Sequence, residues 1–114
     1  MTPITYVLAF LIFIAVLTYT PSNDFSSGAW VADPNKRIEL LDDLIDSGKL
    51  DNLSKEQVIA MLGQPEQGCK YFTNTKRDMI YFLGPERGLF SIDSEWLLIW
   101  FDNGKVNKYE LAID

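Results

Sequence analysis

The pair Asn103-Gly104 constrains the fold of this chain more than any other two residues. Apolar and polar residues alternate on both sides of the pair. Asn and Gly both adopt positive φ readily, and a two-residue type I′ turn needs positive φ at both central positions. The pattern therefore predicts a β-hairpin of Glu95–Asp102 with Lys105–Ile113, in which Asp102 pairs with Lys105.

Counting outward from this turn predicts the faces of the hairpin. We expect Trp100 opposite Asn107, Leu98 opposite Tyr109 and Trp96 opposite Leu111. The face expected to pack on helices carries Trp96, Leu98, Trp100, Tyr109, Leu111 and Ile113. The other face carries four apolar residues, which a two-layer domain leaves uncovered: Leu97, Ile99, Phe101 and Val106. Either the surface or the N-terminal region accommodates them, or they bind a protein partner, with Trp30 as an additional contact.

The residues before the hairpin predict two helices and two more strands. Apolar residues recur at helical spacing after Asp33-Pro34-Asn35, namely Ile38, Leu41, Leu44 and Ile45, and Gly48 ends the pattern. Ser54 and Gln57 fit a capping box at the start of a shorter helix, which ends at Gly63. Strands are expected at Cys69–Thr73 and Asp78–Leu83. The predicted class is α+β, with two short helices packed on a three- to four-stranded antiparallel meander.

The N-terminal residues predict attachment to a membrane. Residues 1–20 contain no charged side chain, and residues 4–19 read ITYVLAFLIFIAVLTY. As a helix these sixteen residues span roughly 24 Å, somewhat less than a hydrocarbon core of about 30 Å. An uncleaved transmembrane anchor is the favoured interpretation. A cleaved signal peptide, for which a basic start and an Ala-x-Ala site are missing, and a buried core helix are the alternatives.

The expected organisation is a membrane segment at 1–20, a linker at 21–35 and a folded domain at 36–114. Pro, Ser, Asn, Asp and Gly dominate residues 21–35, which is typical of linkers. Lys36 and Arg37 follow the apolar segment at a distance where the positive-inside rule still counts, and they favour a cytoplasmic domain.

Composition argues against several classes of function. The net charge of −6 disfavours nucleic acid as a partner. The chain has no histidine, the most frequent general base and metal ligand. Cys69 is the single cysteine, so an internal disulfide cannot form. We therefore expect no enzyme, no cofactor, no metal site and no small-molecule substrate.

Two stretches of the sequence resemble the SmpA/OmlA, or BamE-like, family. Residues 48–65, GKLDNLSKEQVIAMLGQP, look like its helix pair closed by Leu-Gly-x-Pro. Residues 81–84, YFLG, and 98–106, LIWFDNGKV, look like its strand motifs. The family is best known for lipoproteins that act as non-catalytic scaffolds in β-barrel outer-membrane protein assembly, and its fold is similar to that of β-lactamase inhibitor domains. This chain departs from it by having no lipobox cysteine and Asn52-Leu53-Ser54 in place of Gly-Met-Thr.

Taken together, these patterns predict a single-pass protein of the bacterial inner membrane that binds a protein partner without catalysing a reaction. The resemblance implies a periplasmic domain and a role in membrane-protein assembly or envelope maintenance. The alternative hypothesis is an inhibitor or immunity-type protein, whose acidic surface would steer it to a basic toxin or enzyme.

Overall fold

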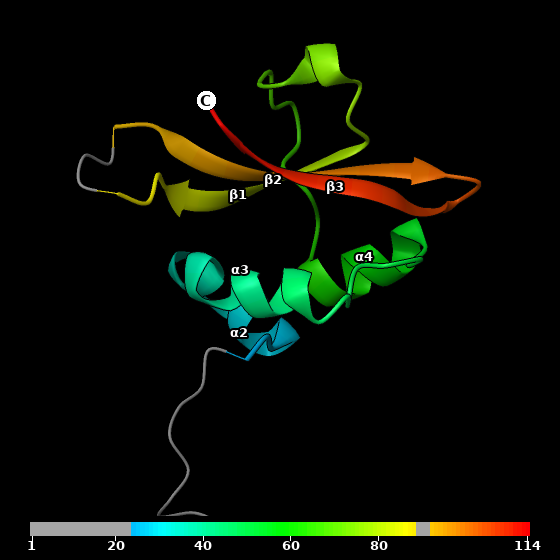
Figure 1. The fold of residues 1–114 in the computed structure, drawn as a ribbon, viewed down its shortest axis with the longest axis horizontal. Helices are drawn as coiled ribbons and strands as arrows, with labels where there is room; N and C mark the ends of the chain where they lie inside the picture. The colour runs from blue at the N-terminus through cyan, green and yellow to red at the C-terminus, as the bar shows by residue number, and fades with distance from the viewer. Residues whose placement is uncertain (1–23, 89–91) are drawn as a thin grey trace, which may run out of the picture.

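The computed structural model describes residues 24–88 and 92–114 and confirms the α+β class. One layer is formed by the helices α2 (Ser27–Ala32), α3 (Arg37–Asp46) and α4 (Lys55–Leu62). The other layer is an antiparallel sheet of β1 (Met79–Pro85), β2 (Ser94–Asp102) and β3 (Lys105–Ile113), in the order β1-β2-β3. Figure 1 shows all three helices on the same side of this sheet. The predicted membrane segment, residues 4–19, lies outside the described residues; among the described helices, none has the length and apolar character to cross a membrane.

The two predicted helices form where the sequence places their signals. A short 3₁₀ turn, η1 (Pro34–Lys36), leads into α3, and Asp33 caps it by accepting a hydrogen bond from the Asn35 amide. The capping box at α4 is confirmed, because the Ser54 amide donates to Gln57 Oε1 while the Gln57 amide donates to Ser54 Oγ. Gly63 ends α4 with φ of 80°, a conformation that favours glycine.

The prediction of a linker at 21–35 is wrong in part, because residues within it belong to the folded domain. Residues 27–32 form α2, with Ser26 as the N-cap. The side chain of Trp30 is fully buried in the main core, next to Phe25 and beneath the Arg37 guanidinium, which lies 5.2 Å from the Trp30 ring. The domain therefore begins about ten residues earlier than the composition indicated, because one large aromatic side chain outweighs its polar neighbours.

The hairpin of β2 and β3 is confirmed, but its register is shifted by one residue beyond the first pairs. Asp102 pairs with Lys105 as predicted, and Asn103 and Gly104 have φ of 52° and 77°. A bulge then follows: Phe101 pairs with Val106, yet Trp100 pairs with Lys108. The residue left between these pairs, Asn107, shifts every later residue of β3 by one position along β2, so Tyr109 shares a face with Ile99 and not with Leu98.

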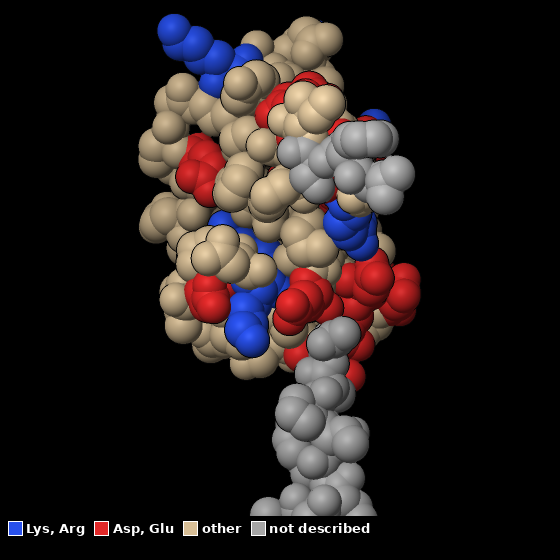
Figure 2. Space-filling model, turned by 90° about the vertical axis from the view of Figure 1, so that its left-hand side faces the viewer, with Lys and Arg blue, Asp and Glu red and all other residues tan. Residues whose placement is uncertain are grey.

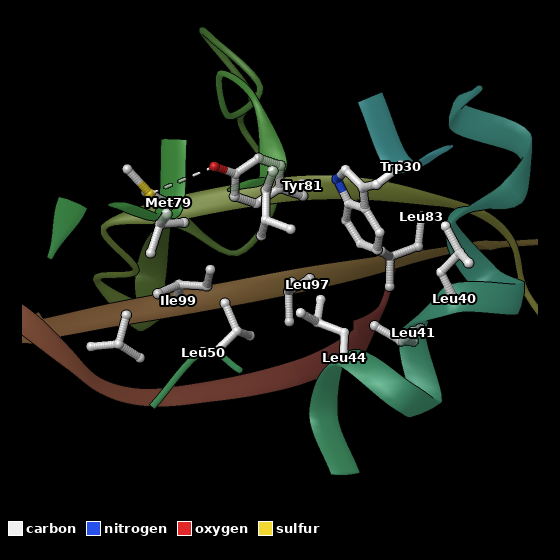
Figure 3. Close-up of a cluster of buried hydrophobic side chains, with 13 residues drawn as sticks. Trp30, Leu40, Leu41, Leu44, Leu50, Met79, Tyr81, Leu83, Leu97 and Ile99 are labelled. Carbon is white, nitrogen blue, oxygen red and sulfur yellow. Dashed lines mark hydrogen bonds between the residues drawn. The ribbon is translucent and has the colours of Figure 1, made fainter. Parts of the chain in front are cut away.

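The faces of β2 are the reverse of the predicted ones, whereas Tyr109, Leu111 and Ile113 of β3 lie on the helix side as predicted. The helices pack on the face that was expected to be uncovered, and the main core holds the fully buried Leu97 and Ile99. Figure 3 shows these two β2 side chains pointing at Leu41, Leu44 and Leu50, with the rest of the core around them. The expected core side chains Trp96 and Leu98 form a smaller cluster with Ile80 on the other face.

The segment between α4 and β1 covers that second face. The predicted strand Cys69–Thr73 is wrong: the chain instead turns through η2 (Thr73–Thr75), with left-handed residues on both sides, Phe72 and Lys76. In Figure 1 this segment rises above the sheet, opposite the helices. Cys69 and Phe72 pack against the smaller cluster. Within the described residues the sheet thus has three strands, and the segment expected to form a fourth strand instead covers one face of the sheet as an irregular loop.

Candidate functional site

The five residues predicted to bind a protein partner all lie on the helix side of the sheet. Trp30, Leu97 and Ile99 are fully buried in the main core, and Val106 is nearly so. Phe101 is half-buried against the same cluster, with Lys55 Nζ 5.7 Å from its ring. The expectation of an uncovered apolar face is therefore wrong, since the helices already occupy it. These side chains hold the two layers together and do not form a surface.

A different site opens on the opposite side, at the edge of the sheet next to β1. It is a pocket of about 600 Å³. Its walls come from four parts of the fold: η1 with the first residue of α3, the segment after α4, strand β1 and strand β2. The lining residues are Pro34, Arg37, Glu66, Gln67, Cys69, Lys70, Tyr71, Phe82 and Trp96.

Three aromatic side chains form the apolar wall of this pocket. Trp96 on β2 lies between Phe82 on β1 and Tyr71 on the covering segment, with ring centroids 5.2 Å and 5.4 Å apart. Trp96 is almost entirely buried, and its Nε1 donates to Asp114 Oδ2 at 2.9 Å. Tyr71 is 53% exposed. The wall thus has a fixed base and an accessible rim, the arrangement in which an aromatic cluster can still gain by burial against a ligand.

Charged groups at the pocket also complete the hydrogen bonding of the β1 edge. Arg37 Nη1 donates to the Phe82 carbonyl at 3.0 Å, and Glu66 Oε1 accepts from the Phe82 amide at 3.3 Å. The Glu66 amide donates to the Ile80 carbonyl at 2.8 Å. These groups take the positions that a fourth strand would otherwise fill. A partner strand is therefore blocked at residues 80–82, while a side chain can still enter the pocket.

Arg37 is held firmly in this position. Its Nε donates to the Trp30 carbonyl at 3.2 Å, and its guanidinium lies over the Trp30 ring. Nη1 is 3.9 Å from Glu66 Oε1. One side chain therefore joins α2, α3 and β1, and it presents a positive charge beside a negative one at the pocket.

The covering segment is fixed by hydrogen bonds to its own turn and to the sheet. The Arg77 guanidinium donates to the carbonyls of Cys69 and Tyr71 at 2.8 to 3.1 Å. Trp100 Nε1 donates to the Thr75 carbonyl at 3.0 Å. Because both ends of the segment are tied down, the pocket wall that Tyr71 supplies is preformed.

The surface charge around the domain is mixed in sign. Figure 2 shows acidic and basic side chains close together on the face that looks left in Figure 1, with a concentration of acidic ones toward its lower right. At the pocket, Arg37 lies beside Glu66, and Lys70 is a further basic residue of the lining. The pocket therefore offers both signs of charge around an apolar wall, which suits a zwitterionic or polar chain better than a polyanion.

Glu95 on β2 is a buried carboxylate. Burial alone would raise the pKa of Glu95, but hydrogen bonds from the Arg87 side chain and backbone, together with the Arg87 charge, outweigh burial and lower it. Glu95 therefore stays ionised and holds the β1–β2 connection, instead of acting as a proton donor. Among residues 24–88 and 92–114, no group of three carboxylate, cysteine or histidine side chains is placed to hold a metal ion.

Comparison with known proteins adds no identification. Neither a search against models of protein families nor a search of curated proteins found a match to this chain. The resemblance to the SmpA/OmlA family stays a prediction from the sequence motifs.

Sequence reasoning missed every residue of the pocket as a site. Trp96 was expected beneath the helices, and the covering segment was expected to be a strand. A usable signal was present in Tyr71-Phe72, two adjacent aromatic residues in a stretch bounded by Gly68 and Asn74. Adjacent aromatic residues between turn-forming residues fit an irregular segment that packs onto a sheet better than they fit a short strand.

Proposed function

We propose that this protein is a non-enzymatic binding module of the bacterial cell envelope, held at the inner membrane by residues 4–19, and that its pocket receives a side chain of a protein partner. The observation that carries the proposal is the pocket itself, in which Tyr71, Phe82 and Trp96 form an apolar wall beside Arg37 and Glu66.

The composition of the pocket supports a protein ligand. Tyrosine, tryptophan and arginine are the residues most enriched at the centres of protein interfaces, where they fill or line desolvated pockets. Arg37 and Glu66 already bond to the Phe82 backbone, and their charges of both signs beside the apolar wall suit the polar groups of a peptide. A fixed wall also lowers the entropy lost on binding, so a modest contact area suffices for recognition.

The short connection to the predicted anchor supports a partner at the membrane. Only residues 20–25 separate Tyr19 from the N-cap Ser26. Six extended residues reach at most about 20 Å. Since α2 is docked through Trp30, the domain cannot move much further from the bilayer. The setting implied by the family resemblance, assembly of membrane proteins in the periplasm, fits that placement.

Photocrosslinking in intact cells tests the proposal. A photoreactive residue replaces Gln67, an exposed residue of the pocket lining, and a second version places it at Glu56, which is exposed on α4. We expect a discrete adduct with a membrane-associated protein from position 67 and not from position 56. Adding Tyr71→Ala, which removes the accessible part of the wall, should reduce the adduct at position 67 at least about tenfold.

Two results would overturn this assignment. Identical adducts from positions 67 and 56 would mean that proximity, not the pocket, determines the crosslink. An undiminished adduct in Tyr71→Ala, with the variant shown to be folded by its circular dichroism, would remove the aromatic wall from recognition. A reporter fused to the C-terminus separately tests the periplasmic location, and a cytoplasmic domain would contradict the envelope setting.

A further inference from the structure

The outer edge of β3 differs from that of β1 in having its backbone groups available. The Asp114 amide donates to the Ser94 carbonyl on β2. Because the backbone of an antiparallel strand alternates its direction, the N–H and C=O groups of Tyr109, Leu111 and Ile113 point away from β2. Among the described residues, no hydrogen bond to these outward groups is present. Along this outer edge, within the described residues, only the start of β3 is paired, where the Val106 amide donates to the Leu53 carbonyl.

The second half of β3 also carries few of the devices that normally protect an edge, and its charged residue Glu110 pairs with Lys108 of the same strand. The bulge at Asn107 and the side chains of Lys105 and Lys108 lie in the first half. In the second half, Leu111 is 45% exposed and Ile113 is 50% exposed, both on the helix side of the sheet. An exposed edge with apolar side chains favours pairing with another strand.

The sequence of this half is complementary to itself when two copies run antiparallel with Leu111 opposite Leu111. Tyr109 then lies opposite Ile113 of the second copy, so the apolar side chains of both chains cover one another. On the other face, Lys108, whose Nζ lies 3.2 Å from Glu110 Oε1 of its own strand, is placed opposite Asp114 of the second copy. The two-fold axis brings these opposite charges together twice. Moving the centre to Tyr109 instead would place Asn107 opposite Leu111 and Lys105 opposite Ile113, which leaves the apolar residues against polar ones.

We propose that the β3 edge is a self-association surface, on which residues 109–113 pair with the same residues of a second copy. The contact joins the two three-stranded sheets into one continuous sheet. It leaves the pocket beside β1 at the far edge of each domain, so one assembly would present two pockets. The partner is a second copy because both the apolar pairing and the Lys108–Asp114 pairing need this same sequence on the facing strand.

Cysteine crosslinking tests the register with the full-length chain in detergent micelles. In a Cys69→Ser background, Leu111→Cys places two thiols directly opposite, with Cβ atoms about 5.5 Å apart. Ile113→Cys places its thiols four residues out of step, roughly 14 Å apart. Mild oxidation should give a covalent dimer from the first variant and at least about tenfold less from the second. Equal yields, or a higher yield from Ile113→Cys, would overturn the proposed register.

Association without a crosslink tests the surface itself. Leu111→Glu places two carboxylates opposite each other, and Val31→Glu is the matched control because Val31 is 51% exposed on α2. Analytical ultracentrifugation should show a dimer for the wild type and for Val31→Glu, with a dissociation constant at least about tenfold higher for Leu111→Glu. The proposal is contradicted if the wild type stays monomeric throughout a 100-fold concentration series in the micromolar range. An unchanged dissociation constant in Leu111→Glu would also contradict it.

Discussion

The two outer strands of the sheet, β1 and β3, differ in whether the backbone groups along their outer edges have hydrogen-bond partners. On β1, the side chains of Arg37 and Glu66 bond to Phe82, and the Glu66 backbone bonds to Ile80. On β3, the described part of the chain pairs only with the first residues of the outer edge and leaves the outward backbone groups of Tyr109, Leu111 and Ile113 without a partner. The comparison teaches that a closed edge can carry a pocket for a side chain, while an open edge is suited to another strand.

The largest effect on stability is expected at Trp30, which anchors the helical layer beside the β1 edge. Trp30→Ala should lower the free energy of unfolding by about 3–5 kcal/mol, because it empties a fully buried site beneath Arg37. Val31→Ala, at the exposed neighbouring position, should change it by no more than about 0.5 kcal/mol. Urea denaturation of the detergent-solubilised chain measures both. Equal effects of Trp30→Ala and Val31→Ala would mean that residues 27–32 belong to the linker and that α2 does not stabilise the β1 edge.

Arg37→Ala should have the next largest effect and lower the free energy of unfolding by about 2 kcal/mol. The change leaves the carbonyls of Trp30 and Phe82 without their donor and removes the cation from the Trp30 ring. Arg37→Lys should recover only part of the loss, since an ammonium cannot reach both carbonyls in the same fork geometry. Lys36→Ala is the control from the adjacent exposed position. If alanine at position 37 is as well tolerated as at position 36, the β1 edge does not depend on this side chain.

Substitutions of two tyrosines, one on each outer strand, should have smaller effects on stability. Tyr81 on β1 is buried and donates to the Gly63 carbonyl at 2.8 Å, whereas Tyr109 on β3 donates to Asp51 at 3.0 Å near the surface. Tyr81→Phe should lower the free energy of unfolding by about 1 kcal/mol, and Tyr109→Phe by less than about 0.5 kcal/mol. Chemical denaturation of the two variants under one buffer condition makes the comparison, and a reversed order would contradict it.

The same pair differs in alkaline solution. Burial raises the pKa of Tyr81 from 10.0 to about 12. Because the folded state holds this proton more tightly than the unfolded state, its contribution is complete below pH 10 and is lost as the pH rises from 10 through about 12. Unfolding of the wild type should therefore depend more steeply on pH in that range than unfolding of Tyr81→Phe. Identical slopes would mean that Tyr81 is not protected in the core.

The local elements of this fold were predictable, and their assembly was not. The caps at Ser54 and the turn at Asn103-Gly104 are decided by neighbouring residues, and both are confirmed. The alignment of β3 on β2 depends on the bulge at Asn107, which has no strong local signal, and the face of β2 that the helices cover was predicted wrongly. Both faces of β2 are apolar, so the pattern of Trp96 to Phe101 could not correct the error. A strand buried on both sides gives no alternation to read.

The pocket could not be predicted from the sequence either, because it depends on how distant segments assemble. Its residues come from positions 34 to 96, and only the packing of the covering segment brings Tyr71 to Trp96. The burial of Trp30 likewise depends on Arg37 and on β1, which lie outside its own segment. Sites made by long-range packing of an irregular loop leave little trace in periodicity, whereas helices and hairpins leave a clear one.

Residue-resolved amide hydrogen exchange tests the difference between the two edges most directly. In dilute protein, the amides of Tyr109, Leu111 and Ile113 should exchange rapidly, while those of Phe82, Glu110 and Ala112 should be protected. Raising the protein concentration should slow the first three and leave the others unchanged, because pairing of β3 with a second copy satisfies only the outward groups. Protection of Leu111 equal to that of Phe82 in dilute protein, with no dependence on concentration, would contradict the account.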